Sequence, residues 1–467
     1  MDDRKRLLER AAELGEAFLA GVGDRRVFPT ATAESLRSTL GVELTDRGEE
    51  PMAVIEALAH DADPGLVASA GPRYFGFVIG GSVPTSVAAD WLTSAWDQNA
   101  GLYASSPASS VIEDVAAGWI LDLLGLPATA GVGFATGATM ANLTGLGAAR
   151  SAVLDRVAWD VEARGLIGAP PIRIFVGDEV HTTVPYALRV LGLGGATATR
   201  VAVDGQGAMR ADALRDALAS DTSPAIVCAQ AGNVNTGAFD PIGPIVEAAH
   251  EVGAWVHVDG AFGLWAGASP ELRHLVAGIE RADSWTTDAH KWLNVPYDCG
   301  IAIVADRRWQ VRSMALTAAY LIAADHDRDP YDYVPEGSRR GRATPVYAAL
   351  RAMGRNGLAE LVERCCRLAR RFAEGLAAEP GIRILNDVVL NQVLVRFDAA
   401  DAADVPAGDA RTRAAIGVIQ RDGTLWAGGT TWHGLAAMRL SVSGWATTDA
   451  DIDRSIEAIV RCARSVA

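Results

Sequence analysis

The 467-residue sequence lacks long hydrophobic runs and any concentration of basic residues. A membrane-spanning helix needs roughly 18 consecutive apolar residues, and because no stretch reaches that length, we expect no membrane span. Lysine and arginine total 42 against 57 aspartates and glutamates, which gives a formal net charge of −15. Since a nucleic-acid interface needs a basic patch or stripe, we expect no nucleic-acid partner.

Cysteine is scarce, and the first residues carry no pattern of an export signal. The five cysteines are odd in number and lack the spacing of metal ligands, so we expect reduced thiols packed as small hydrophobic side chains and no metal site. The opening 21 residues alternate charged side chains with Leu and Ala at helical spacing, without an apolar signal core. A cytoplasmic location is therefore expected.

Strand and helix patterns alternate regularly through the middle of the chain. Hydrophobic residues make up 49% and charged residues 21%, as in a large folded protein, and the length suggests about three domain-sized units. The alternation predicts an α/β fold with a mainly parallel, seven-stranded sheet covered by helices on both faces. The β-type runs lie at 131–135, 172–177, 198–203, 224–229, 254–258, 283–287 and 301–305, and the helical stretches include 137–150, 183–192, 208–219 and 242–252.

We expect three segments: an N-terminal helical segment at 1–85, a large domain at 86–345 and a smaller C-terminal α+β domain at 346–467. Ligands of open α/β sheets usually bind at the loops that follow the carboxyl ends of the strands, so motifs in those loops are the candidates for function. The smaller domain is expected to contain a long helix at 346–378, strands near 382–386, 391–397 and 437–443, and a closing helix from Thr448.

The sharpest chemical signal is the segment DSWTTDAHKWLNVPYD, in which His290 and Lys291 follow a short strand and precede an apolar turn. Such a lysine can be a side chain that reaches solvent at the rim of a sheet. Desolvation and nearby cations can also lower the pKa of a lysine amine from about 10.4, so that it condenses with an aldehyde as a Schiff base. The segment by itself leaves both interpretations open.

A carboxylate follows another buried-strand pattern, AWVHVDGAFG, 32 positions earlier (291 − 259). Asp259 can cap a turn, as Asp before Gly often does. Alternatively, an ionised carboxylate at a strand end can keep a pyridine nitrogen protonated, which makes the ring an electron sink. Ala261 is small enough to let such a ring lie flat.

Two further strand ends carry polar groups. In GVGFATGATMANLTGL, Gly137, Ala138 and Thr139 place free amides and a hydroxyl at the start of a helix, which favours a phosphate dianion, although any βα unit can turn through glycine. In VGDEVHTTVPYALRV, His181 follows a strand, and taken alone it is best interpreted as a hydrogen-bonded surface or N-cap histidine.

Together these motifs have the order and approximate spacing of a known family. From about Gly71 to the C-terminus, the sequence resembles the group II pyridoxal-phosphate-dependent amino-acid decarboxylases, which have the fold of aspartate aminotransferase, known as fold type I. The resemblance implies pyridoxal 5'-phosphate as cofactor, decarboxylation of an L-amino acid to the amine and CO2, and a homodimer with shared active sites.

The resemblance also implies a role for each motif residue. Lys291 would bind the cofactor aldehyde, Asp259 would pair with the pyridine nitrogen, and His181 would stack on the ring. The Gly137–Ala138 backbone and the Thr139 hydroxyl would hold the phosphate, with His290 beside them. Asp288 occupies a place often filled by a polar residue that contacts phosphate, where a carboxylate is electrostatically awkward.

Two residues would act on the substrate. Tyr320 lies 29 positions after Lys291 (320 − 291), which matches the loop tyrosine that protonates the substrate α-carbon in these decarboxylases; a core aromatic is the alternative. Arg439, in an apolar strand pattern, resembles the arginine that receives the substrate α-carboxylate in several fold-type-I enzymes, and an internal ion pair explains it equally well. Arg342 matches an arginine of the family's SRR-x-R segment, with a solvated helix start as the alternative.

Other activities share most of these motifs. An aminotransferase would use Lys291, Asp259 and Arg439 but leaves Tyr320 unexplained. A carbon–carbon lyase differs only in the substrate bond placed for cleavage. A non-catalytic pyridoxal-phosphate-binding regulator would need a DNA-binding appendage, and the sequence shows no pattern of one.

Overall fold

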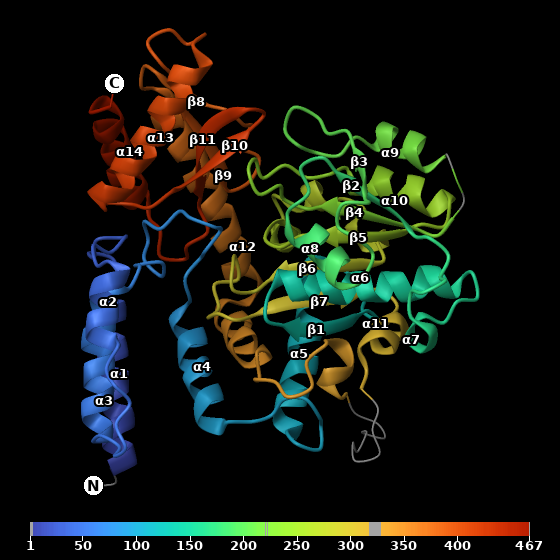
Figure 1. The fold of residues 1–467 in the computed structure, drawn as a ribbon, viewed down its shortest axis with the longest axis horizontal. Coiled ribbons are helices and arrows are strands. Elements are labelled where there is room, and N and C mark those ends of the chain that lie inside the picture. The colour runs from blue at the N-terminus through green and yellow to red at the C-terminus, as the bar shows by residue number, and fades with distance from the viewer. Residues whose placement is uncertain (1–2, 220, 222, 317–327, 467) are drawn as a thin grey trace. The chain divides into compact units, whose positions relative to one another are not determined.

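A computed structural model describes residues 3–219, 221, 223–316 and 328–466 (Figure 1). These residues form two compact units. The larger unit comprises 80–369 and 386–392, and the other comprises 1–79, 370–385 and 393–467. The N-terminal helices thus share a compact unit with the C-terminal segment. The helix at 51–62 packs against those at 3–21 and 33–40, and the Val27 amide, after the first helix, donates to the Gly423 carbonyl at 2.9 Å. The expected segments 1–85, 86–345 and 346–467 remain a proposal about how the chain divides by role.

The larger unit is built on a seven-stranded sheet of order β1-β7-β6-β5-β4-β2-β3. β2 pairs in parallel with β3 and β4, and the parallel pairing continues through β5 to β6, whereas β7 is antiparallel to both of its neighbours. The predicted α/β fold with a mainly parallel sheet is confirmed. The strands are β1 Gly131–Ala135, β2 Arg173–Gly177, β3 Thr199–Val201, β4 Ala225–Gln230, β5 Trp255–Asp259, β6 Ser284–Asp288 and β7 Gly300–Val304.

Helices follow the strands because the apolar side chains on both faces of the sheet need cover. α6 packs along β1 and β4–β7, and α10 packs against β4 and β5 (Figure 1). Between α6, α8 and the sheet lies a core that includes Leu146, Leu188 and Ile226, all fully buried. The helices of this unit are α4 Pro84–Trp96, α5 Pro107–Leu124, α6 Ala138–Asp155, α7 Val161–Arg164, α8 Thr183–Val190, α9 Ala211–Leu218, α10 Ile242–Glu251 and α11 Arg307–Met314, with short 3-10 helices η2 Gly263–Ala268, η3 Arg273–Val276, η4 Ile279–Arg281 and η5 Pro330–Tyr333.

The other unit has a four-stranded sheet of order β10-β11-β9-β8. The pattern near 382–386, 391–397 and 437–443 predicted three of these strands, but we did not predict β10 or the helix α13. The closing helix begins after Thr448, whose side chain forms a reciprocal capping box with Asp451. The elements are α1 Asp3–Gly21, α2 Ala33–Leu40, α3 Pro51–Ala62, η1 Asp63–Gly65, β8 Ile382–Ile384, β9 Gln392–Phe397, α13 Val405–Asp422, β10 Gly428–Trp432, β11 Leu435–Ser441 and α14 Asp449–Arg464.

The long helix predicted at 346–378 is α12, Ala343–Ala377, which is interrupted at Gly354. Gly354 has φ 61°, in the left-handed region that only glycine adopts at little cost, so two helical stretches meet there. No helix among the described residues is long and apolar enough to cross a membrane. All five cysteines are buried and free, as expected.

Candidate active site

Asp259 ends β5 and is held through both of its carboxylate oxygens. Its Oδ1 accepts a hydrogen bond from the Ala261 amide at 3.1 Å. Its Oδ2 accepts from the Asn142 side chain at 3.0 Å and from the Thr183 hydroxyl at 3.4 Å. Asp259 is only 5% exposed, so these contacts replace water for a buried charge and fix the plane of the carboxylate.

Lys291 follows the next strand, β6, and its amine meets the carboxylate that ends that strand. Lys291 Nζ lies 3.2 Å from Asp288 Oδ2, and the lysine side chain is 19% exposed, whereas the Asp288 side chain is 2% exposed. The other carboxylate oxygen, Oδ1, accepts a 2.6 Å hydrogen bond from the amide of Ala138. Asp288 therefore occupies an amide of the turn that was predicted to hold phosphate.

The phosphate turn and Asp288 are brought together by the antiparallel strand β7. In the sheet register, Gly300 at the start of β7 pairs with Ala135 of β1 on one side and with Asp288 of β6 on the other. A Cβ at Gly300 would lie 2.3 Å from the carbonyl carbon of Gly137, so glycine is required for the turn to approach the sheet this closely.

His290 points its Nε2 toward the same turn. The Cys299 amide donates to His290 Nδ1 at 3.1 Å, which leaves the ring proton on Nε2, 3.5 Å from Asp288 Oδ1. Burial lowers the pKa of His290, which favours this neutral form. The ring stacks on Tyr297 at a centroid distance of 4.3 Å. This stacking and the Cys299 contact hold the ring with its Nε2–H available as a hydrogen-bond donor.

His181 is partly buried in the loop after β2, and its Nδ1 lies 2.8 Å from the Thr183 hydroxyl. The side chain of Gln230, at the end of β4, accepts from the His181 amide at 3.1 Å and donates to the Glu179 carbonyl at 3.2 Å. Gln230 thus fixes the position of the loop that carries the histidine.

The structure unites most of the predicted site residues at one edge of the larger sheet. Those in the larger unit are Gly137, Ala138, Thr139, His181, Asp259, Ala261, His290 and Lys291. Arg439 lies on β11 of the other unit, where burial lowers its pKa. Tyr320 lies outside the described residues. Arg342 forms ion pairs with Asp298 at 2.9 Å and Glu336 at 3.0 Å, so two carboxylates already neutralise its charge.

Asn142, Thr183 and Gln230 also belong to the site and were not predicted. Asn142 lies one turn into α6, after the phosphate turn, and Thr183 lies two positions after His181. A polar residue in an otherwise apolar helix is a usable signal, but its partner cannot be read from sequence spacing. These three contacts are set by elements far apart in the chain.

The arrangement fits pyridoxal phosphate. A lysine amine suits the aldehyde, a fixed carboxylate suits the pyridine nitrogen, and the start of α6 with the His290 donor suits an anion. The amides at the start of a helix point out of its N-terminus toward an anion. In α6 the Met140 and Ala141 amides donate to the Gly137 carbonyl, and Asp288 already occupies the amide of Ala138. The fold and this set of side chains place the protein in the class of pyridoxal-phosphate enzymes.

Comparison with known proteins identifies the family. The family model "Pyridoxal-dependent decarboxylase conserved domain" matches residues 34–398. The acidic amino acid decarboxylase GADL1 of Homo sapiens is 28% identical over 361 residues, which cover 75% of this chain and 68% of that protein. The aromatic-L-amino-acid decarboxylase of Bos taurus is 29% identical over 402 residues, which cover 82% of each chain.

Solved structures share the fold across the whole chain. A structure titled as Oryza sativa TDC with PLP and tryptamine has a TM-score of 0.93 at 24% identity and covers 100% of this chain and 98% of its own. Mouse CSAD has a TM-score of 0.89 at 24% identity and covers 98% of both chains. The chain belongs to the pyridoxal-dependent decarboxylase family, and it is a pyridoxal-phosphate-dependent amino-acid carboxy-lyase.

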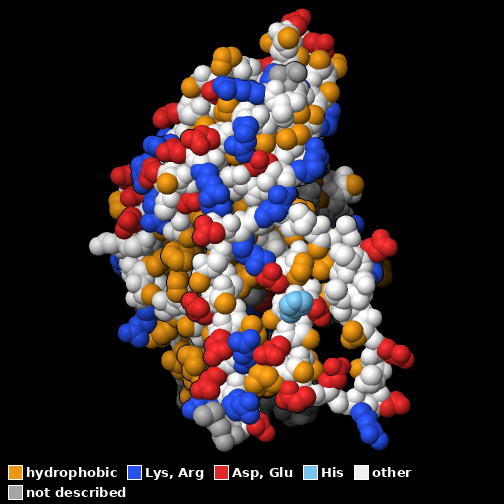
Figure 2. All heavy atoms as spheres, turned by 90° about the vertical axis from the view of Figure 1, so that its left-hand side faces the viewer, with side chains coloured by type: hydrophobic (Ala, Val, Ile, Leu, Met, Phe, Trp, Pro, Cys, Tyr) orange, Lys and Arg blue, Asp and Glu red, His pale blue; other side chains and the backbone are white. Residues whose placement is uncertain are grey.

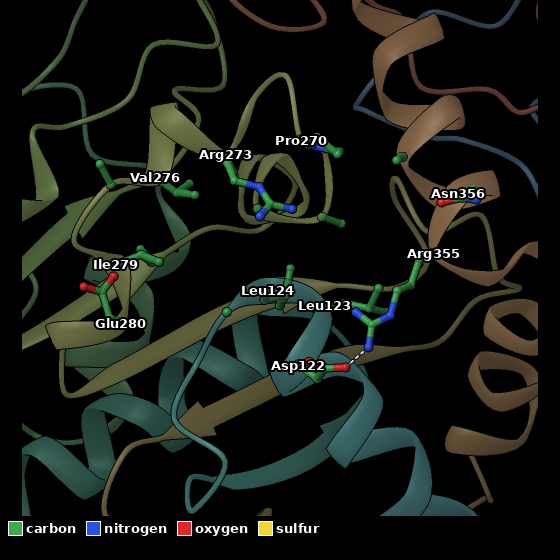
Figure 3. Close-up of a pocket in the computed structure, with 15 residues that line it drawn as sticks. Asp122, Leu123, Leu124, Pro270, Arg273, Val276, Ile279, Glu280, Arg355 and Asn356 are labelled. Carbon is green, nitrogen blue, oxygen red and sulfur yellow. Dashed lines mark hydrogen bonds and ion pairs between the residues drawn. The ribbon is translucent and has the colours of Figure 1, made fainter.

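A separate cavity of about 500 Å³ lies in the larger unit (Figure 3). It is lined by the end of α5, by η3 and η4, and by α12, and the Arg355 guanidinium points to Asp122, with which it forms an ion pair. None of the predicted site residues lines it. The cavity is therefore not part of the candidate active site.

Proposed function

We propose that Lys291 binds pyridoxal phosphate covalently and that the bound cofactor serves the decarboxylation of an L-amino acid to its amine and CO2. One observation carries the proposal: the amine of Lys291, the fixed carboxylate of Asp259 and the turn at Gly137–Thr139 meet at one edge of one sheet. The family's cofactor supplies an electron sink that stabilises the carbanion left when CO2 departs.

The protein's own residues orient the groups and control protons. Asp259 holds a proton at the pyridine nitrogen, because its carboxylate is fixed by Ala261, Asn142 and Thr183. His181, on a loop fixed by Gln230, would stack on the cofactor ring. Thr139, with the backbone of Gly137 and Ala138, and the Nε2–H of His290 bind the phosphate.

The last proton transfer is assigned to Tyr320, which donates its phenolic hydrogen to the substrate α-carbon. The substrate α-carboxylate is assigned to Arg439, whose alternative role is an internal ion pair. The Lys291 amine would hold the cofactor again once the product amine has left. An aminotransferase would move the proton through Lys291 instead, and no observation favours that activity.

We propose a homodimer with shared active sites in the cytoplasm. The helices α1, α2 and α3 contain no buried residue, although they carry apolar side chains. Leu8, Leu58 and Val54 are 59%, 56% and 44% exposed, and Figure 2 shows apolar side chains exposed among charged ones on one face of the molecule. Exposed apolar side chains of this kind favour burial against a second copy of the chain. Sedimentation should give about twice 49.0 kDa, and a 49.0 kDa species at micromolar concentration would contradict the dimer.

The lysine content makes the central assignment simple to test, because Lys5 and Lys291 are the only lysines in the sequence. Borohydride reduction of the holoenzyme followed by peptide mapping should place the pyridoxyl group on Lys291. A panel of amino acids should then give amine and CO2, with Lys291→Ala as the inactive control. Labelling of Lys5 alone, or keto acid as the main product, would overturn the proposal.

A further inference from the structure

A line of buried hydrogen bonds runs from the interior of the large sheet to Asp259. Trp255 Nε1 donates to Ser284 Oγ at 2.9 Å, and Ser284 Oγ lies 2.8 Å from His257 Nδ1. His257 Nε2 lies 2.8 Å from Asn142 Oδ1, and Asn142 Nδ2 donates to Asp259 Oδ2 at 3.0 Å. Ser284, His257 and Asn142 are 0% exposed, so water cannot substitute for any of these contacts.

The order of elements explains why these groups meet. Trp255, His257 and Asp259 alternate along β5, so their side chains share one face of the sheet. Ser284 is the register partner of His257 on β6. The face is covered by α6, which supplies Asn142.

The line has a single direction because its two ends have fixed roles. An indole N–H only donates and an ionised carboxylate only accepts. Because Asp259 accepts from Asn142 Nδ2, Asn142 Oδ1 faces His257 and accepts from its Nε2–H, so the neutral ring presents Nδ1 as an acceptor. Ser284 accepts from Trp255 and gives its own hydrogen to that Nδ1.

Two further observations support a neutral, fixed histidine. Burial lowers the pKa of His257 to about 4, against an opposing effect of Asp259, so the ring holds one proton at neutral pH. A Cβ at Gly145, one turn after Asn142 on α6, would lie 2.7 Å from His257 Cε1. The helix can bring Asn142 against the histidine only because this position has no side chain.

We propose that Asn142 and His257 are positioning residues that orient the Asp259 carboxylate for the cofactor's pyridine nitrogen, through a one-directional line of neutral donors that begins at Trp255. The inference rests on the proposed role of Asp259. Each neutral donor polarises the next, so the line strengthens the last hydrogen bond to the carboxylate. Asn142 and Thr183 both donate to Oδ2, and the Ala261 amide donates to Oδ1.

The first test needs no cofactor turnover. Nitrogen-15 NMR of the histidine-labelled protein, with His257 assigned from the spectrum of His257→Gln, should show a neutral ring protonated on Nε2. A ring protonated on Nδ1, or a charged ring at pH 7, would overturn the proposal whether or not Asn142→Leu and His257→Phe fold.

The second test uses the holoenzyme with 15N-labelled pyridoxal phosphate. Asn142→Leu and His257→Phe should shift the pyridine nitrogen signal toward the unprotonated form and lower kcat by about 10- to 100-fold, as for loss of a hydrogen bond to a charged group, with KM changed less than threefold. His257→Gln keeps a donor and should recover most of the loss. If folded, cofactor-loaded Asn142→Leu shows an unchanged pyridine nitrogen signal and an unchanged kcat, the positioning role of Asn142 is overturned and the role of Asp259 stands. If the pyridine nitrogen is unprotonated in the wild type, the proposed role of Asp259 itself is overturned.

Discussion

Asp288 brings a second negative charge to the place where the proposed phosphate binds. Its carboxylate is buried, accepts from the Ala138 amide at 2.6 Å and pairs with Lys291 at 3.2 Å. When Lys291 is linked to the cofactor, its positive charge is no longer fully available to that carboxylate. A phosphate dianion and Asp288 then repel each other in a site with little water.

Asp288→Asn should therefore bind pyridoxal phosphate about tenfold more tightly, the equivalent of ~1.4 kcal/mol. The Asn carbonyl can still accept from Ala138, and its amide can donate to phosphate. Equilibrium dialysis gives the affinity. Pyridoxal, which lacks the phosphate, is the matched probe: a variant that changes both affinities equally would show that Asp288 acts through Lys291 and not on the phosphate.

At the scale of elements, the site depends on how β7 fits between β1 and β6. Gly300 lies at the point where the phosphate turn and Asp288 come together, and a Cβ there would meet the backbone of Gly137 at 2.3 Å. Backbone atoms cannot move aside as a flexible side chain can, so the turn would have to shift.

Gly300→Ala should weaken cofactor binding by at least tenfold and lower the free energy of unfolding by about 1–3 kcal/mol, the range for overpacking. Denaturant unfolding and cofactor titration measure the two effects. Gly118→Ala is a suitable control, because Gly118 lies in α5 with nothing within 4 Å of its added Cβ and should be neutral or stabilising by up to ~1 kcal/mol. Equal behaviour of the two variants would show that the turn does not need Gly300.

The pairing of β5 with β6 also makes stability depend on pH through His257. The ordinary histidine pKa is 6.5, and burial lowers that of His257 to about 4. The unfolded chain therefore binds the extra proton first, so the stability that the neutral ring contributes is present above about pH 6.5 and is lost as pH falls toward 4. The loss reaches about 3 kcal/mol.

The comparison of wild type with His257→Gln isolates this effect. Burial raises the pKa of Asp240 to about 6, so protonation of Asp240 stabilises the fold as pH falls and partly hides the effect of His257. Asp240 is present in both proteins, so its effect cancels in the comparison. The difference in free energy of unfolding between the two proteins should therefore shrink between pH 6.5 and 4. A constant difference over this range would mean that His257 has the same pKa in the folded and unfolded chains.

At the scale of the whole molecule, the reaction outcome depends on delivery of a proton to the substrate α-carbon. We expect Tyr320→Phe to keep the cofactor and bind substrate but to lose most amine production, because the carbanionic state lacks a phenolic donor and can react with oxygen to give an aldehyde. Amine, aldehyde and keto acid are quantified together for both proteins with one substrate. If wild type and Tyr320→Phe both make mainly keto acid at similar rates, Tyr320 is not the proton donor of a decarboxylation.

The sequence alone determined the fold class and predicted the main groups of the proposed site, because both follow from local order. Alternating strand and helix patterns predict a mainly parallel sheet, and Lys291, Asp259 and the turn at Gly137–Thr139 each follow a strand. The carboxyl ends of parallel strands share one edge, so their proximity follows from the pattern.

Only the tertiary structure decided which side chains hold these groups in place. The spacing along β5 puts His257 and Asp259 on one face, but it does not say that Asn142 of α6 lies between them. Nor does it say that Asp288 occupies the Ala138 amide, or that Arg342 is already paired with Asp298 and Glu336. Hydrogen bonds and ion pairs act over about 3–4 Å. Residues as far apart in the chain as Asn142 and Asp259, or Ala138 and Asp288, come within that range only when the sheet and its covering helices have assembled.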